Sequence, residues 1–474
     1  MYKLSDFKDL NEECGVFAIT GVEDAAHLVY LGLYALQHRG QEAFGMCATA
    51  VQEGESWVKA TKDFGLVADG MSSAKLSQLQ GSTCLGHVRY STQGGRLSEN
   101  IQPFVFRLPQ LGQIAMAHNG NLTNALELRE QLERAGSVFT STSDSEVFIH
   151  LLARSNAQSL GDKIAGLMYQ VKGAYALCFA AGDHLYAVRD PYGFRPLVIG
   201  QLDGKSVIAS ETCALDLIGA ETVREVYPGE MICMGPDGQF DSTFPMGRDT
   251  RPAFCAFESI YFARPDSQRN GESFYQVRFR IGQRLACDFL PEDADTVVPV
   301  PDSGVPMAMG FAHEAGLPME LGLVRNHYVG RTFIEPGQMN RDFKVKLKLS
   351  PVQSVLNGKS VVLIDDSVVR GTTCMRIVRM IREAGAKKIH LRIGSPPITH
   401  PCHYGVATPS KKDLLAANLS VDEIARRLEV DSLQYISQPG LRLALGDQTQ
   451  QGFCYACFDG DYREYIEKKA YQEQ

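Results

Sequence analysis

The sequence contains no run of about 20 uninterrupted apolar residues, the length that a helix needs to cross a bilayer. It has no excess of basic charge either, since 47 Lys and Arg against 55 Asp and Glu give a formal net charge of −8. This balance argues against binding nucleic acid through a broad basic surface. The first 13 residues mix charges of both signs with few apolar side chains, unlike a secretory signal. We therefore expect neither a membrane nor a nucleic acid as partner.

Cysteine is not scarce, but nothing suggests that it forms disulfides. Twelve cysteines without an export signal indicate a reducing compartment, and we expect the cytoplasm. Most of them should pack as small buried residues. The length of 474 residues predicts two to four domains, and 44% hydrophobic with 22% charged residues is ordinary for globular proteins. The sequence shows no internal repeat and no low-complexity segment.

The two halves of the chain differ in pattern. The first half reads as many short strands with a few helices, expected at residues 25–37, 124–135 and 144–155. From 174 to 234, apolar runs alternate with Gly- and Pro-containing turns, which predicts antiparallel strands. The second half alternates apolar strands with helical patterns, which favours a parallel sheet. The polar, breaker-rich stretch 235–252 is the expected domain boundary.

Residues 361–373, Val-Val-Leu-Ile-Asp-Asp-Ser-Val-Val-Arg-Gly-Thr-Thr, are the most informative segment. A buried strand ends at Asp365 and Asp366, and a loop of small and hydroxylated residues leads into a helical pattern that ends near Gly385. Backbone N–H groups at a helix start attract phosphate, and carboxylates can bind ribose hydroxyls or magnesium. The bland alternative is a buried strand followed by a solvated acidic turn.

Two further segments belong to the same half. The apolar strand 296–301 runs into the small-residue turn 302–304. Because parallel strands end at one edge of a sheet, this turn is expected beside Asp365. A basic segment begins at Arg325 and continues to Lys348. It is either a solvated surface loop or a flap that closes over a ligand.

The first half contains several dense polar segments. Cys14 opens an apolar strand, where a cysteine is most often a packed core residue. Arg89 lies inside a strand pattern, and His118-Asn119-Gly120-Asn121 follows another one. Asp144 precedes a helical pattern and could simply cap that helix.

Four cysteines of the second half form a possible metal site. Cys454 and Cys457 make a Cys-x-x-Cys pair, Cys255 follows the expected boundary, and Cys402 lies in His-Pro-Cys-His. Four thiolates suit either zinc or an iron–sulfur cluster. The spacing does not choose between them.

The segment 361–373 resembles the phosphoribosyl pyrophosphate motif of type I phosphoribosyltransferases. The resemblance implies that Asp365 and Asp366 bind the ribose and magnesium, with Ser303 as a further magnesium contact. It makes 325–348 a flap that includes Arg331. The implied contacts to phosphoribosyl pyrophosphate are Asp365, Asp366, Ser367, Val368, Val369, Arg370, Gly371, Thr372, Thr373 and Arg331.

The polar segments of the first half resemble glutamine amidotransferase domains of the N-terminal nucleophile (Ntn) type. In that family the nucleophile is a cysteine at the mature N-terminus, whose α-amine, with a pKa near ~8, serves as general base. The resemblance therefore implies that Cys14 is the nucleophile and that residues 1–13 are a propeptide. It implies that Arg89 binds the glutamine α-carboxylate and Asp144 its α-ammonium. Asn119 and the Gly120 N–H would form the oxyanion hole.

Together the motifs cover nearly the whole chain and resemble the iron–sulfur-containing branch of the amidophosphoribosyltransferases. The resemblance implies an α+β Ntn-hydrolase sandwich at 14–240, an α/β phosphoribosyltransferase domain with a parallel sheet at 253–457 and a tail at 458–474. It implies Mg2+, a 4Fe–4S cluster on Cys255, Cys402, Cys454 and Cys457, a homotetramer, and purine nucleotides as inhibitors.

The implied reaction converts glutamine, phosphoribosyl pyrophosphate and water to 5-phosphoribosylamine, glutamate and pyrophosphate. Two other classes remain open. An aminosugar-forming amidotransferase would explain the first half but give 361–373 no role. A non-catalytic sensor of phosphoribosyl pyrophosphate would explain the second half but give no role to Cys14, Arg89 and Asn119.

Overall fold

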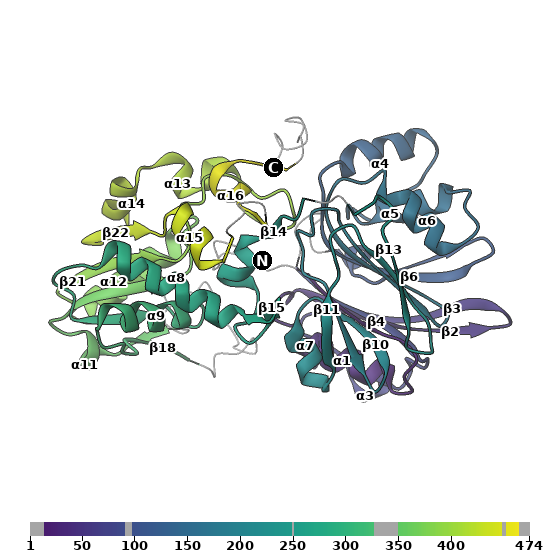
Figure 1. The fold of residues 1–474 in the computed structure, drawn as a ribbon, viewed down its shortest axis with the longest axis horizontal. Helices are drawn as coiled ribbons and strands as arrows, with labels where there is room; N and C mark the ends of the chain where they lie inside the picture. The colour runs from purple at the N-terminus through teal and green to yellow at the C-terminus, as the bar shows by residue number, and fades with distance from the viewer. Residues whose placement is uncertain (1–13, 91–96, 249–250, 327–348, 448–451, 464–474) are drawn as a thin grey trace, which may run out of the picture.

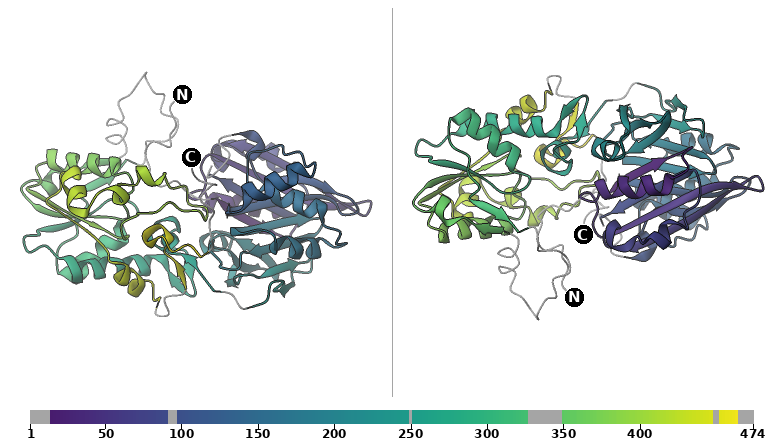
Figure 2. Two further views of the ribbon diagram at one scale, coloured as in Figure 1. Left: turned by 90° about the horizontal axis from the view of Figure 1, so that it is seen from above. Right: turned by 90° about the horizontal axis from the view of Figure 1, so that it is seen from below.

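The computed structural model describes residues 14–90, 97–248, 251–326, 349–447 and 452–463. These residues form two lobes that lie side by side along the longest axis of the molecule (Figures 1 and 2). The N-terminal lobe contains strands β1 to β13, and the C-terminal lobe contains β14 to β23.

The N-terminal lobe is built on a 13-stranded sheet system with the order β11-β9-β10-β1-β4-β2-β3-β6-β7-β8-β12-β13, and with β5 paired to β6. Its strands are β1 Gly15–Ile19, β2 Ala43–Gln52, β3 Glu55–Phe64, β4 Thr83–Arg89, β5 Phe104–Leu108, β6 Gly112–Leu122, β7 Gly173–Ala181, β8 His184–Arg189, β9 Val198–Leu202, β10 Lys205–Ala209, β11 Glu221–Glu225, β12 Met231–Met234 and β13 Phe240–Thr243. Strands β3 and β6 meet only at Ser56 and Gly112, so the system folds into two packed halves.

Alternation along the strands explains the layers of this lobe. In β1, Phe17 and Ile19 pack under helices α1 (Ala25–Ala35) and α7 (Thr212–Ile218), whereas Val16 and Ala18 face the other half of the sheet system. On the far side, α4 (Ala125–Arg134), α5 (Glu146–Arg154) and α6 (Leu160–Met168) cover β5 to β8. The result is a four-layer sandwich of helices, strands, strands and helices. The short elements are α2 Val67–Gly70, α3 Ser73–Leu76 and η2 Ser98–Asn100.

The C-terminal lobe is built on a four-stranded parallel sheet with the order β17-β20-β21-β22. Its strands are β17 Thr296–Pro299, β20 Ser360–Asp365, β21 Lys388–Ile393 and β22 Ser432–Tyr435. Strand β20 is apolar on both faces, because Val362 and Ile364 face one core while Val361 and Leu363 face the other. This is the pattern of a sheet covered by helices on both sides.

Helices cover both faces of this parallel sheet. They are α8 Phe274–Phe289, α9 Val305–Ala315, α11 Gln353–Leu356, α12 Thr372–Glu383, α13 Leu415–Asn418, α14 Val421–Leu428, α15 Gln438–Ala444 and α16 Ala456–Asp459, with η3 Glu258–Phe262 and η4 Lys411–Asp413. Three short strand pairs lie outside the sheet: β14 Phe254–Cys255 with β23 Phe453–Cys454, β15 Gln268–Arg269 with β16 Glu272–Ser273, and β18 Leu323–Arg325 with β19 Leu349–Pro351.

The predicted fold class is confirmed in both halves, with antiparallel pairing throughout 173–243 and a parallel sheet after 296. The expected helices appear as α1, α4 and α5. The last strand of the N-terminal sheet, β13, lies inside the breaker-rich stretch 235–252. None of the helices in the described parts of the chain combines the length and the apolar character needed to cross a bilayer.

Candidate functional site

Cys14 lies at the start of β1, next to the end of β4. Strands β1 and β4 are antiparallel with Gly15 opposite Val88, which brings Cys14 beside Arg89. The Cys14 thiol is half-buried and donates to the carbonyl of Tyr90, with Sγ and O 3.6 Å apart. The Cys14 carbonyl accepts a hydrogen bond from Nε of Arg39 at 3.1 Å. The sequence pattern alone pointed to Cys14 but not to Arg39.

Asn119 and Gly120 lie in the middle of β6, on the facing half of the sandwich. Gly120 has a φ of +148°, and a Cβ there would lie 2.1 Å from the carbonyl oxygen of Ala174. Only glycine therefore fits this backbone. The two halves meet directly, because Nε2 of His87 on β4 donates to the His118 carbonyl at 3.2 Å.

Two buried histidines, both neutral, lie at this junction between the two halves of the sandwich. Burial, with a contribution from the charge of Arg89, lowers the pKa of His87 to about 3. Burial also lowers the pKa of His118, against the opposing charge of Asp144. Neutral His118 can donate from Nε2 to the Ala174 carbonyl at 3.3 Å while its Nδ1 accepts from Ser145 Oγ at 2.9 Å.

Asp144 does not cap α5. The N-cap residue of that helix is Ser145, which makes no side-chain cap bond. The Asp144 carboxylate instead accepts from the backbone N–H of Leu122 at 2.9 Å, just beyond Gly120 on β6. Cys14, Arg89, Asn119, Gly120 and Asp144 are thus linked by neighbouring strands and hydrogen bonds. His118 and Ser145 complete this arrangement, and the sequence gave no signal for Ser145 beyond its place in a polar run.

The second group of predicted residues lies at the carboxyl edge of the parallel sheet. Strands β17 and β20 are neighbours, and the Val300 N–H donates to the Ile364 carbonyl at 2.8 Å. Ser303 Oγ donates to Asp366 Oδ2 at 2.5 Å, and Ser367 Oγ donates to Asp366 Oδ1 at 2.6 Å. Asp365 accepts from the Asp366 N–H at 2.9 Å. The two loops predicted to meet are therefore in contact.

The loop after β20 is anchored by its own apolar residues. Val368 and Val369 are each only 1% exposed and pack into the two cores on opposite sides of the sheet. Their side chains therefore face away from any ligand in the loop, to which they can offer backbone atoms only. Gly371 has a φ of +72° and is the N-cap residue of α12, whose first turn carries Thr372 and Thr373. This N-terminus is suited to binding a phosphate.

Arg331 and most of the basic segment 325–348 lie outside the described residues. Its first residue, Arg325, forms an ion pair with Asp302 in the loop after β17. The basic segment therefore starts next to the turn 302–304 that follows β17.

The four predicted ligand cysteines lie around one cavity. Cys255 on β14 is directly opposite Cys454 on β23. Both line one pocket together with Cys402 and Cys457, and Phe194 and Arg195 of the other lobe contribute to its wall. None of the four cysteines is part of a disulfide. Burial raises the pKa of Cys454 to about 12, and burial with the neighbouring cysteines raises that of Cys457 well above its usual range.

The four cysteines line one pocket, and their thiolates could hold a metal ion or a cluster there. Within 14–90, 97–248, 251–326, 349–447 and 452–463, no three His, Cys, Asp or Glu side chains are arranged to hold a metal ion.

The cysteine loop also joins the two lobes. Asn121 Nδ2, on β6, donates to the His403 carbonyl at 3.0 Å. Gly405 lies so close to Gly120 that a Cβ on Gly405 would be 3.2 Å from the Gly120 backbone. Tyr404 stacks on Phe194 with 4.0 Å between ring centroids. Residues 402–405 thus pack directly on the strand that carries Asn119.

The sequence matches two family models, one for each lobe. Residues 87–216 match the glutamine amidotransferase domain, and residues 270–393 match the phosphoribosyl transferase domain. The chain is 46% identical to amidophosphoribosyltransferase of Bacillus subtilis over 97% of its length and 96% of that protein. It is 49% identical to the chloroplastic amidophosphoribosyltransferase 2 of Arabidopsis thaliana, over 95% of this chain and 79% of that protein.

A solved structure has the same fold along both chains. Glutamine phosphoribosylpyrophosphate amidotransferase from Bacillus subtilis, complexed with ADP and GMP, superposes with a TM-score of 0.90. The two sequences are 44% identical, and the match covers 96% of this chain and 98% of that one.

Fold and site together define a glutamine amidotransferase joined to a phosphoribosyltransferase. The chain belongs to the amidophosphoribosyltransferase family. It is an enzyme that transfers ammonia from glutamine to phosphoribosyl pyrophosphate, giving 5-phosphoribosylamine, glutamate and pyrophosphate. This reaction is the first committed step of de novo purine biosynthesis. The two alternative functions are thereby set aside, because each of them leaves one lobe without a role.

Proposed function

We propose that the two half-reactions take place at the two groups of residues described above, with Cys14 as nucleophile in the N-terminal lobe and the loops after β17 and β20 as the site of ribosyl transfer. The observation that carries the proposal is the contact of residues 402–405 with the strand of Asn119. It joins the lobes directly beside the proposed glutamine site. Ammonia released there can reach the second site without entering bulk water, where it would become protonated.

The Cys14 thiolate attacks the side-chain amide of glutamine and forms a thioester. The proton acceptor is the α-amine of Cys14, which is free only after residues 1–13 have been removed. The half-buried position of Cys14 at the start of β1, beside Arg89, is consistent with a mature N-terminus there. The intact mass of the active protein tests this step, because retention of Met1 in fully glutamine-active enzyme would contradict it.

Arg89 binds the glutamine α-carboxylate, for which a planar guanidinium is suited. Asp144 binds the α-ammonium, and its bond to Leu122 N–H keeps it next to β6. The Asn119 side chain and the Gly120 N–H stabilise the oxyanion of the tetrahedral intermediate. Each such donor typically lowers the barrier by about 3 kcal/mol.

In the C-terminal lobe, the backbone N–H groups from Ser367 to Thr373 bind the 5-phosphate at the start of α12. Asp365 and Asp366 bind the ribose hydroxyls. Asp366 and Ser303 already share a hydrogen bond, so both oxygens can face one magnesium ion together with Asp365. Magnesium supplies charge neutralisation for the departing pyrophosphate. Arg331 and the remainder of 325–348 close over the phosphates and exclude water.

The group held by the four cysteines is a 4Fe–4S cluster with a structural role. The placement of Cys255, Cys402, Cys454 and Cys457 around one pocket supports this proposal. Iron, sulfide and a brown colour in anaerobically purified protein are the expected findings. Equimolar zinc without sulfide would contradict it.

Purine nucleotides are the proposed feedback inhibitors, since a relative with the same fold was solved with ADP and GMP. A homotetramer and a location in the cytoplasm complete the proposal, and sedimentation of the native enzyme tests the tetramer.

The central test measures glutamate and pyrophosphate release while each substrate is omitted in turn. Cys14→Ala should abolish glutamine-dependent synthesis and keep synthesis from added ammonia. Glutaminase turnover should rise when phosphoribosyl pyrophosphate is added. Equal loss of both activities in Cys14→Ala would contradict the assignment of the nucleophile.

A further inference from the structure

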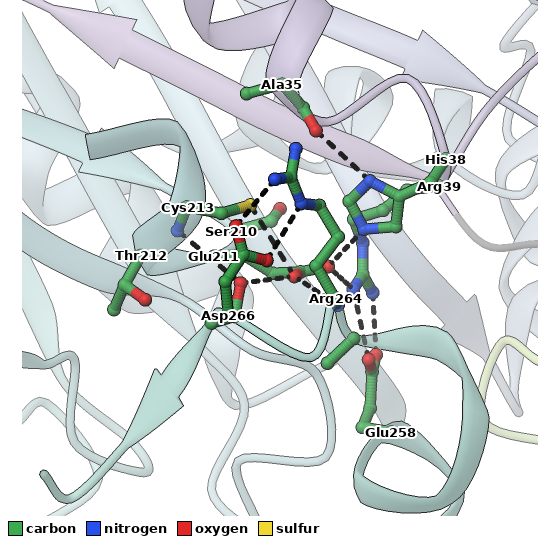
Figure 3. A network of polar contacts seen from close by, with 12 residues as sticks. Ala35, His38, Arg39, Ser210, Glu211, Thr212, Cys213, Glu258, Arg264 and Asp266 are labelled. Atoms are coloured by element: carbon green, nitrogen blue, oxygen red, sulfur yellow. Dashed lines mark hydrogen bonds and ion pairs between the residues drawn. The ribbon is translucent and has the colours of Figure 1, made fainter. Parts of the chain in front are cut away.

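Arg39 connects the backbone of Cys14 to the other lobe. It follows helix α1, and its side chain is fully buried. Its Nε donates to the Cys14 carbonyl at 3.1 Å. Its Nη1 and Nη2 donate to the carboxylates of Glu211 and Glu258 (Figure 3). The Arg39 guanidinium therefore holds the backbone of Cys14, the proposed nucleophile, and two carboxylates hold the guanidinium in turn.

The principal acid is Glu258, which comes from η3 at the start of the C-terminal lobe. Its two carboxylate oxygens accept from Arg39 Nη2 at 2.6 Å and from Nη1 at 3.0 Å, a paired geometry (Figure 3). Arg195 Nη1 lies 3.3 Å from the same carboxylate. The side chains of Arg39, Arg195 and Glu258 are all 0% exposed. Glu258 thus brings a fully buried carboxylate of the C-terminal lobe to Arg39.

The second acid, Glu211, ties the same network to the chain around Ser267. Glu211 accepts from Arg39 Nη1 at 2.6 Å and from His38 Nε2 at 2.7 Å, and its other oxygen accepts from Ser267 Oγ at 2.7 Å (Figure 3). Burial opposes ionisation of Glu211, but the charges of His38 and Arg39 outweigh burial and hold its pKa below the usual range. Arg39 is thus held by one carboxylate from each lobe, Glu211 of the N-terminal lobe and Glu258 of the C-terminal lobe.

We propose that Glu258 is a positioning residue for glutamine hydrolysis, although it belongs to the phosphoribosyltransferase lobe. It orients Arg39, and Arg39 in turn orients the carbonyl of Cys14 and hence the thiol and α-amine of that residue. Small displacements of a reacting group can cost about a hundredfold in rate. The glutamine half-reaction therefore depends on a carboxylate of the other lobe, while ribosyl transfer does not use that carboxylate. This inference rests on the proposed role of Cys14.

The test compares Glu258→Gln with a matched control, Glu225→Gln. Glu225 lies at the end of β11 and forms an ion pair with Arg269 of the other lobe at 3.2 Å. It also pairs with Arg189 at 3.3 Å. Both substitutions thus remove one carboxylate charge from a contact between the lobes, but the Glu225 carboxylate pairs with Arg189 and Arg269, whereas the Glu258 carboxylate pairs with Arg39 and Arg195.

Glu258→Gln should lower kcat with glutamine by about ten- to a hundredfold, with KM for glutamine changed by less than about threefold. Synthesis from ammonia should stay within about twofold of the parent enzyme. Glu225→Gln should leave the ratio of the two activities unchanged. Arg39→Lys should behave like Glu258→Gln, because an ammonium cannot reach the Cys14 carbonyl and both carboxylates at once.

Glu258→Asp keeps the charge and covers the case in which Glu258→Gln does not fold. Its shorter side chain should move Arg39 and lower glutamine-dependent turnover selectively. Parallel loss of both activities in the Glu258 variants, or an equal change of the ratio in Glu225→Gln, would overturn the proposal. Cys14→Ala is run beside them: if it kept its glutamine-dependent activity, the role of Cys14 would fail first, whatever the Glu258 variants do.

Discussion

The two sites of this enzyme are built in opposite ways. The proposed glutamine site lies between strands of a sandwich, and its residues are joined through buried bonds such as His87 to His118 and Asp144 to Leu122. The proposed ribosyl-transfer site lies in loops at the edge of a parallel sheet, and the basic segment expected to cover it starts at Arg325. The comparison teaches that packing of the fold fixes the geometry of the first site. In the second site the fold fixes only the loops at the base, and the ligands complete the site.

The largest contrast should come from removing one oxyanion donor. Asn119→Ala should lower kcat with glutamine by about 10²- to 10³-fold, because the charge of the intermediate loses a preorganised donor. Synthesis from ammonia should be unaffected. The two rates, measured on one preparation, check this. A comparable fall with ammonia would show that the lobes cannot be separated in this way.

A substitution in the proposed ribosyl-transfer site should lower both activities, unlike Asn119→Ala. Asp366→Asn should lower synthesis from both glutamine and ammonia by roughly a hundredfold, since metal and ribose binding serve both routes. Ser303→Ala removes only the hydrogen bond to Asp366 and serves as a milder control. Magnesium titrations of the activity of both variants check this prediction. If Asp366→Asn depended on magnesium as the parent enzyme does, another residue would hold the ion.

Substitution of one glycine in each site by alanine compares how rigid the two sites are. Gly120→Ala places a Cβ 2.1 Å from the Ala174 backbone, which cannot move without breaking the β6–β7 ladder, so we expect a loss of about 3 kcal/mol in the free energy of unfolding. Gly371→Ala meets Leu415 Cδ2 at 2.9 Å, a side-chain end that can rotate, and should cost about 1–2 kcal/mol from its positive φ. Denaturant titrations measure both. Equal losses would remove the distinction.

A last expected effect is a dependence of stability on pH in the N-terminal lobe. Burial lowers the pKa of His87 from 6.5 to about 3, so the unfolded state binds more protons between these values and stability falls as pH drops below 6.5. At pH 5 this one histidine should cost about 2 kcal/mol relative to neutral pH. His87→Gln should flatten the dependence. An unchanged slope would assign the acid sensitivity to other groups.

The sequence predicted those parts of the site that lie on continuous segments. Residues 361–373 contain strand, acids, loop and helix start in order, so local pattern alone placed Asp365 at the end of β20, Asp366 directly after it and Gly371 at the start of α12. The prediction that Ser303 lies beside this loop followed from the parallel sheet, and its bond to Asp366 confirms the contact.

The remaining features depend on contacts between distant residues. Arg39 and Glu258 are 219 positions apart, and the sequence assigned no specific role to either of them. The sequence offered a helix-capping alternative for Asp144, and only the fold shows that its carboxylate binds β6 instead. Helix α7 was missed because seven residues inside a run of strands carry too little periodicity to be distinguished.

The pairing of β14 with β23 has a consequence for synthesis on the ribosome. Phe254 and Phe453 lie side by side and share one core with Phe257, Tyr455 and Phe458. The N-terminal sandwich can close as soon as residue 243 has left the exit tunnel. The second lobe must wait with exposed apolar surface until Phe453 has been made, and closing so long a loop is slow. The nascent chain is therefore most exposed to aggregation and proteolysis in that interval.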